Sequence, residues 1–145
     1  MYPRSVCLGM TMCKTESRNV TEQIPIPQPP AVLVVEDDVM LRVQTAMTLE
    51  DEGFTVIEAD SADAALEVLT SRTDIRVVFT DIQMPGSMDG LKLAAAVRDR
   101  WPPIGIILTS GRGNIRAQDV PERGLFFPKP FDPSKLIEAM RGLLQ

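Results

Sequence analysis

Asp81 is the residue of this sequence best placed to take part in a reaction. It follows a nearly continuous apolar run at residues 75–79, interrupted by Arg76, which predicts a strand buried on both faces of a parallel sheet. Pro85 comes soon after it and ends any regular strand. Open α/β sheets place their chemistry at the carboxyl ends of their strands. We therefore interpret Asp81 as a candidate acceptor of a phosphoryl group.

Candidate functional side chains follow the other predicted strands as well, although the second strand, at 54–59, contributes nothing comparable. Because parallel strands point the same way, these side chains should converge on one edge of the sheet. They are the carboxylates of Glu36, Asp37 and Asp38 after a strand at 32–35, the Thr109 hydroxyl after a strand at 104–108, and the Lys129 ammonium after a strand at 125–127.

This set of groups suits phosphoryl transfer to a carboxylate. Adjacent carboxylates repel one another unless they are solvated or bind a cation, and Mg²⁺ prefers oxygen ligands. Lys129 could hold one phosphoryl oxygen, and the hydroxyl of Thr109 could donate to another after moving inward. No Gly-Lys-Ser/Thr loop is present, so the chain does not cradle nucleotide phosphates in that manner.

The elements that must position these groups alternate between strand and helix. Asp38, Ser61 and Asp132 are predicted helix N-caps, and Asp132 is followed by a proline, which favours the first helical position. In the first helix, the apolar residues Met40, Val43 and Met47 recur at helical spacing. Residues 112–123 are weakly patterned, so any helix there should be short or poorly ordered. Five strands alternating with helices predict a parallel α/β sheet covered on both faces.

Composition limits the class of protein. The 145 residues are 44% hydrophobic and 24% charged, which is typical of one soluble globular domain. No apolar run approaches the length of a membrane helix, and the net charge of −5 argues against a nucleic-acid partner. The chain has no histidine, so it lacks the commonest general base and any phosphohistidine of its own.

The amino-terminal residues are predicted to lie outside the domain. Residues 24–30 are proline-rich and should be extended, which makes 1–30 a disordered tail and 31–145 the folded domain. Cys7 and Cys13 both fall in this tail, and we interpret them as thiols without a metal or disulfide role. The absence of cysteine from the predicted core suits a reducing cytoplasm.

From about residue 31 to 144, the sequence resembles the response-regulator receiver domains of two-component signalling. The motifs that carry the resemblance are Val34-Val35-Glu36-Asp37-Asp38, Asp81-Ile82-Gln83-Met84-Pro85 with Asp89-Gly90, Leu108-Thr109-Ser110, and Lys129-Pro130-Phe131. The resemblance implies a flavodoxin-like (βα)5 doubly wound parallel sheet with strand order 2-1-3-4-5. It also implies a stand-alone receiver in the cytoplasm that is not a turnover enzyme.

The resemblance implies a role for each matching residue. Asp81 would be the phosphorylated aspartate, and Mg²⁺ would be bound by Glu36, Asp37, Asp81 and the backbone carbonyl of Gln83. Thr109 would be the switch hydroxyl, and Lys129 the phosphate-binding lysine with a cis bond to Pro130. Phe126 falls where the family keeps a switching aromatic, although it could equally be an ordinary core residue. Asp38 is interpreted as a helix cap rather than a metal ligand.

The implied partners are a sensor histidine kinase or a histidine phosphotransfer protein, together with an output protein that the sequence does not identify. Two alternatives remain at this point. One is a Mg²⁺-dependent phosphohydrolase with an aspartyl nucleophile, although such enzymes usually carry a second aspartate where this chain has Gln83. The other is an interaction module that has lost phosphorylation.

Overall fold

The computed structural model describes residues 29–86, 88–111 and 115–144, and these residues contain one five-stranded sheet. Its strands are β1 (Ala31–Val35), β2 (Thr55–Ala59), β3 (Ile75–Asp81), β4 (Gly105–Ser110) and β5 (Gly124–Pro128). All pairings are parallel, and the order is β2-β1-β3-β4-β5. The predicted fold and strand order are therefore confirmed. The predicted tail falls mainly on residues 1–28, which lie outside the described residues.

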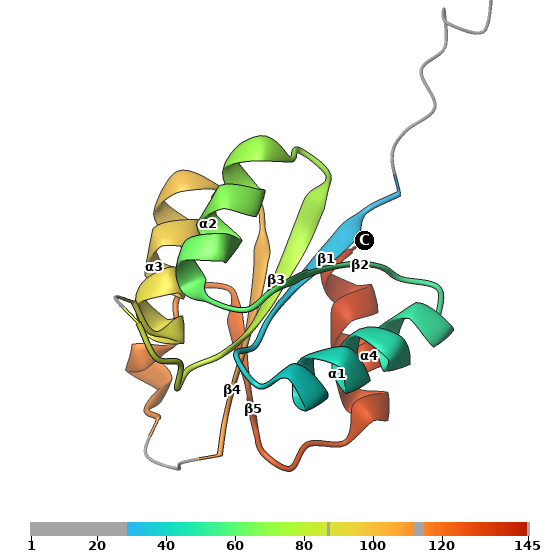
Figure 1. Ribbon diagram of the computed structural model, residues 1–145. Coiled ribbons are helices and arrows are strands. Elements are labelled where there is room, and N and C mark those ends of the chain that lie inside the picture. The colour runs from blue at the N-terminus through green and yellow to red at the C-terminus, as the bar shows by residue number, and fades with distance from the viewer. Residues whose placement is uncertain (1–28, 87, 112–114, 145) are drawn as a thin grey trace, which may run out of the picture.

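The helices cover both faces of this sheet (Figure 1). They are α1 (Val39–Asp51), α2 (Ala62–Ser71), α3 (Gly90–Arg100) and α4 (Pro133–Leu143). Successive residues of β1 point to opposite faces, so Leu33 and Val35 join a core with α2 and α3, whereas Val32 and Val34 join a core with α1 and α4. The central strands are buried on both sides, which explains their nearly continuous apolar sequence.

The predicted helix starts are confirmed. The carboxylate of Asp38 accepts from the backbone N–H of Leu41, and the hydroxyl of Ser61 accepts from the backbone N–H of Ala64. Asp132 caps α4 in the same way, with Pro133 at the first helical position. Each cap follows a strand end closely, so it fixes the direction in which the chain leaves the edge of the sheet.

The three apolar residues that indicated α1 in the sequence do not face the core. Met40 and Met47 are 72% and 58% exposed, and Val43 is also exposed. The buried residues of this helix are Ala46 and Leu49. The helical spacing of Met40, Val43 and Met47 thus correctly indicates a helix, but it marks the solvent-facing side rather than the buried side.

The connection between β4 and β5 is short and carries no α-helix among its described residues. A single 3-10 helix, η3 (Ala117–Asp119), stands there, which agrees with the weak helical pattern of residues 112–123. Within the described parts of the chain, no helix combines the length and apolar character needed to cross a membrane.

Candidate functional site

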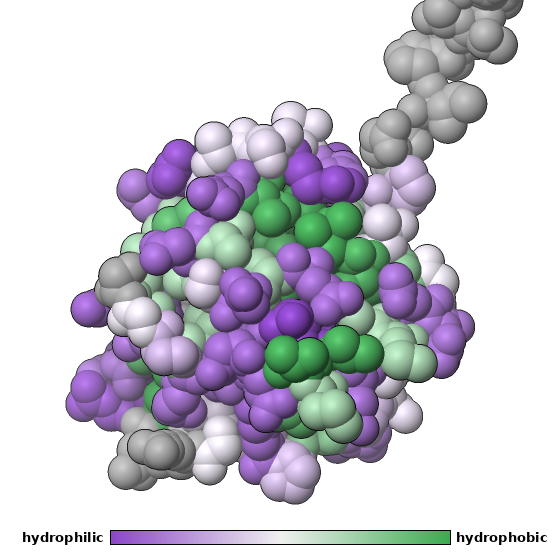
Figure 2. Space-filling model, viewed as in Figure 1, coloured by the Kyte–Doolittle hydropathy of each residue, from purple (hydrophilic) through white to green (hydrophobic). Residues whose placement is uncertain are grey.

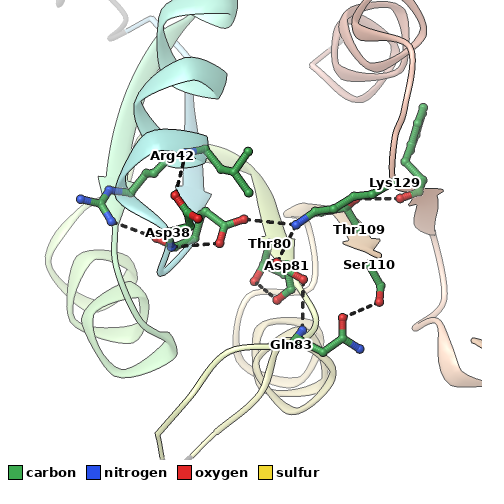
Figure 3. Close-up of polar contacts among 11 residues, drawn as sticks. Asp38, Arg42, Thr80, Asp81, Gln83, Thr109, Ser110 and Lys129 are labelled. Atoms are coloured by element: carbon green, nitrogen blue, oxygen red, sulfur yellow. Dashed lines mark hydrogen bonds and ion pairs between the residues drawn. The ribbon is translucent and has the colours of Figure 1, made fainter. Parts of the chain in front are cut away.

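The carboxyl edge of the sheet brings together a carboxylate and an ammonium group from distant parts of the chain. Asp81 ends β3, and Lys129 directly follows β5. The Nζ atom of Lys129 lies 2.7 Å from Oδ2 of Asp81 (Figure 3). The peptide bond between Lys129 and Pro130 is cis, as expected. Asp81 is 7% exposed, so this ion pair is largely protected from solvent.

Glu36 and Asp37 complete an acidic cluster around Asp81. Each of the three residues offers a carboxylate oxygen, and these oxygens lie within 4.8 Å of one another. Glu36 also accepts from the backbone N–H of Asp38 at 3.1 Å and from Nζ of Lys129 at 3.5 Å. Asp37 is exposed, whereas Glu36 and Asp81 are buried, so the cluster opens to solvent on one side.

Burial raises the pKa of Glu36 to about 7, and the negative charge of Asp81 acts in the same direction. Burial opposes the charge of Lys129, but its hydrogen bond to Asp81 and its attraction to both carboxylates outweigh that effect and raise the pKa of Lys129. Three carboxylates therefore share one ammonium. The excess negative charge and the all-oxygen donor set fit a hard divalent cation such as Mg²⁺.

Thr109 lies beside Asp81 in the sheet register, but its hydroxyl points elsewhere. Its Oγ1 donates to the backbone carbonyl of Phe127 at 2.7 Å, and the side chain is 3% exposed. Phe126, next in the chain, is half-buried and packs against the core on the α2–α3 side. To reach a phosphoryl group on Asp81, Thr109 must give up its bond to β5.

Gln83 is bonded to Asp81 through its main chain. Its backbone N–H donates to Oδ1 of Asp81 at 3.1 Å. The side chain instead turns toward β4, where its Oε1 accepts from the hydroxyl of Ser110 at 2.5 Å (Figure 3). Gln83 is exposed on its loop, whereas Ser110 is 2% exposed and lies within β4.

Gly90 fixes the start of α3 against the end of β3. A Cβ atom at this position would stand 2.1 Å from the backbone oxygen of Asp81. The Gly90 N–H donates to the carbonyl of Ile82, and Asp89 caps the helix through the N–H of Lys92. Only glycine allows α3 to begin this close to the backbone of Asp81.

A cleft of about 600 Å³ leads from the site between α1 and α4. Glu36, Thr109 and Lys129 line its inner end, while Leu49 and Phe79 are among its apolar residues. The exposed apolar side chains of α1 lie on the neighbouring surface, and Figure 2 shows hydrophobic side chains gathered over this helix. The opening of the site is thus bordered by apolar surface.

The structure brings together most of the predicted site residues. One cluster contains Glu36, Asp37, Asp81 and Lys129, and Thr109 lies beside it. Phe126 lies apart from the cluster, on β5. The role of the Gln83 carbonyl as a metal ligand stays a prediction.

Sequence reasoning assigned no role to Arg42 and Ser110. Arg42 donates to the backbone carbonyl of Glu36 at 2.9 Å and to the carboxylate of Glu58 at 3.1 Å, which holds the turn after β1. The sequence feature that could have indicated this role is a basic residue one helical turn after Asp38. No sequence pattern indicates the contact between Ser110 and Gln83.

Comparison with known proteins gives consistent matches. The family model of the response regulator receiver domain matches residues 32–141. The response regulator protein FleR of Pseudomonas aeruginosa is 37% identical over 110 residues, which cover 74% of this chain and 23% of FleR. The nitrogen assimilation regulatory protein NtrX of Azorhizobium caulinodans is 34% identical over 110 residues, covering 73% of this chain and 24% of NtrX. The chain thus spans about a quarter of the length of these curated relatives.

Solved structures agree with the sequence matches. A response regulator receiver protein from Pseudomonas putida aligns with a TM-score of 0.73 and 30% identity, covering 81% of this chain and 99% of that chain. The receiver domain of NtrX from Brucella abortus aligns with a TM-score of 0.70 and 36% identity, covering 78% of this chain and 97% of that chain.

Proposed function

The chain belongs to the family of response regulator receiver domains, and on this premise we propose that Asp81 accepts a phosphoryl group from a phosphohistidine donor. The observation that carries the proposal is the 2.7 Å contact between Lys129 and Asp81 within a cluster that also holds Glu36 and Asp37. Asp81 is the carboxylate that lies nearest to the only ammonium of this cluster.

Each of these residues has a part in the transfer. An oxygen of Asp81 attacks phosphorus, and the bond between phosphorus and the donor nitrogen breaks, so that the imidazole leaves with its electron pair. Lys129 neutralises charge on a phosphoryl oxygen, as a fixed cation does in other phosphoryl transfers. Glu36, Asp37, Asp81 and the Gln83 carbonyl would hold Mg²⁺, which supplies further charge neutralisation when bound.

The donor would be a sensor histidine kinase or a histidine phosphotransfer protein. These 145 residues contain no histidine, so the domain itself does not carry the phosphohistidine. The exposed Met40, Val43 and Met47 on α1 offer that partner an apolar contact surface near Asp81.

Phosphorylation would then draw Thr109 inward and away from the Phe127 carbonyl. That change would favour a second arrangement of β5 and Phe126, which is how a local charge change shifts a two-state element. Output would pass through protein contact in the cytoplasm. The domain would catalyse only its own phosphorylation and dephosphorylation, and Gln83 supplies no acid where a phosphohydrolase would use one.

Labelled acetyl phosphate tests the proposal without a cognate kinase. We expect ³²P to enter the wild-type chain in the presence of Mg²⁺ and not in EDTA. Asp81→Asn should take up no label, whereas Asp99→Asn, at an exposed position on α3, should be labelled like the wild type. Equal labelling of Asp81→Asn would refute the assignment of the acceptor.

A further inference from the structure

The side chains of Gln83 and Ser110 are hydrogen-bonded to each other next to Asp81. The proposed phosphoryl transfer gives this contact no role. Gln83 follows Asp81 by two residues, and its backbone N–H already bonds to that carboxylate. Its side chain is therefore within reach of anything attached to Asp81. The contact with Ser110 directs it toward β4 (Figure 3).

The two residues differ in freedom of movement. Ser110 is 2% exposed at the end of β4, and its carbonyl accepts from the backbone N–H of Lys129 at 2.9 Å. Gln83 is exposed on the loop after β3. The serine is thus the fixed member of the pair, and it determines where the carboxamide of Gln83 lies.

The hydrogen bond from Ser110 is made to the oxygen of the Gln83 carboxamide, which is the atom of that group able to accept a hydrogen bond. A carboxamide has one oxygen that accepts and one nitrogen that only donates. The Ser110 hydroxyl donates to Oε1 and so takes up one of the two lone pairs of that oxygen. A water molecule that attacks a phosphoryl group is oriented by an acceptor, a role that glutamine can fill in other phosphoryl-transfer proteins. While it is bound to Ser110, the Gln83 oxygen is held toward β4.

We propose that Ser110 is a positioning residue that lengthens the life of the aspartyl phosphate by holding the Gln83 carboxamide away from the attacking water. This inference rests on the proposed phosphorylation of Asp81. In hydrolysis, the water oxygen bonds to phosphorus, and the bond between phosphorus and the Asp81 oxygen breaks. That oxygen keeps the electron pair and becomes a carboxylate oxygen again. The protons of the water pass to the released phosphate and to solvent.

Four proteins test the proposal: the wild type, Ser110→Ala, Gln83→Met and the double variant. Methionine matches the length of glutamine but has no amide, so it removes the acceptor with little change in shape. Each protein is labelled with ³²P-acetyl phosphate and Mg²⁺, freed of donor by desalting, and followed as the label is lost. Thermal unfolding of all four shows whether each retains its fold.

We expect Ser110→Ala to lose its label about fivefold faster than the wild type, the factor expected from one neutral hydrogen bond made in the transition state. Gln83→Met and the double variant should lose label at the same rate as each other, because the proposal has the Ser110 hydroxyl act on hydrolysis through the Gln83 carboxamide. A merely structural effect of Ser110 would persist in the double variant.

Two results would overturn the inference while leaving the acceptor role intact. In the first, Ser110→Ala loses its label no faster than the wild type. In the second, Ser110→Ala speeds label loss by the same factor whether residue 83 is glutamine or methionine. Failure of the wild type itself to take up label would instead refute the proposed function, and the inference with it.

Discussion

The Lys129 ammonium and the Asp81 carboxylate lie 2.7 Å apart, although 47 residues separate them in the chain between positions 81 and 129. The pair places a positive charge where a phosphoryl group would arrive. It also places that charge beside the carboxylates that would hold Mg²⁺. Lys129 should therefore favour phosphoryl transfer and oppose metal binding.

Substitution of Lys129 separates these two effects. We expect Lys129→Met to be phosphorylated more slowly, on the order of 100-fold, because one charge-stabilising donor is lost. The same variant should bind Mg²⁺ more tightly, since the cluster loses its cation. Stopped-flow labelling and metal titration measure the two effects, with Lys135→Met, at an exposed position on α4, as the control. Weaker Mg²⁺ binding by Lys129→Met would contradict this account.

Glu36 should make metal-free stability depend on pH. Its pKa rises from 4.5 to about 7 on folding, so the folded chain holds a proton that the unfolded chain releases. The free energy of unfolding should therefore fall as pH rises from about 5 to about 7. Urea unfolding in EDTA measures this slope, and Glu36→Gln should flatten it. An unchanged slope in that variant would show that another group is responsible.

Mg²⁺ binding provides a second test of the Glu36 pKa. A protonated Glu36 cannot serve as a ligand, so the ion must displace its proton. We expect proton release on binding near pH 6.5, which calorimetry in buffers of different ionisation enthalpy detects. Little release should occur above pH 8, where Glu36 is already ionised.

The Thr109 hydroxyl should be needed for signalling rather than for labelling. Thr109→Val keeps the shape but leaves the Phe127 carbonyl without its donor, which should cost about 1 kcal/mol of unfolding free energy. With Mg²⁺ and beryllofluoride, which mimics an aspartyl phosphate, amide NMR shifts should reach Phe126 in the wild type and in Thr109→Ser. They should stop near Asp81 in Thr109→Val. Equal shifts at Phe126 in all three proteins would exclude the switch role.

Gly90 should be intolerant of any side chain. Gly90→Ala forces a Cβ into the backbone of Asp81 and Ile82, so we expect a loss of about 1–3 kcal/mol in unfolding free energy and slower phosphorylation. Gly142→Ala is the matched control, because nothing lies within 4 Å of a Cβ on that helical glycine. It should be stabilising by about 0.5–1 kcal/mol. Similar effects at both positions would contradict a specific contact at Gly90.

The exposed face of α1 should tolerate polar substitution. Met47→Gln changes a side chain that is 58% exposed, so its effect should stay within about 0.5 kcal/mol. Leu49→Ala, on the buried side of the same helix, should cost about 2–5 kcal/mol. Urea unfolding compares the two. A comparable loss from Met47→Gln would show that this face is packed against protein.

The sequence predicted features that depend on periodicity and on strand direction. Buried strands alternating with capped helices indicated the α/β class, and parallel strand ends placed Asp81 and Lys129 on one edge. The helix N-caps could also be predicted from the sequence, because Asp38 and Ser61 bond to backbone groups only three residues away.

Side-chain direction could not be predicted in the same way. Helical spacing identified α1, but Met40 and Met47 gave no sign that their side faces solvent, since that depends on where the helix rests on the sheet. Thr109 is similar: its position follows from the register, whereas its bond to Phe127 depends on the relative placement of two strands. The expectation that the receiver works without an attached output domain stays a prediction.

The contact between Gly90 and Asp81 has an optical consequence. Helix α3 starts directly on the backbone of the acceptor and runs eleven residues, about 16 Å, to Trp101. Trp101 is half-buried, and the guanidinium of Arg100 lies 4.4 Å from its ring centre. A tilt of α3 at Gly90 would change the solvent exposure of the Trp101 ring at the other end of the helix. We therefore expect the fluorescence of Trp101, the single tryptophan of the chain, to report such a tilt.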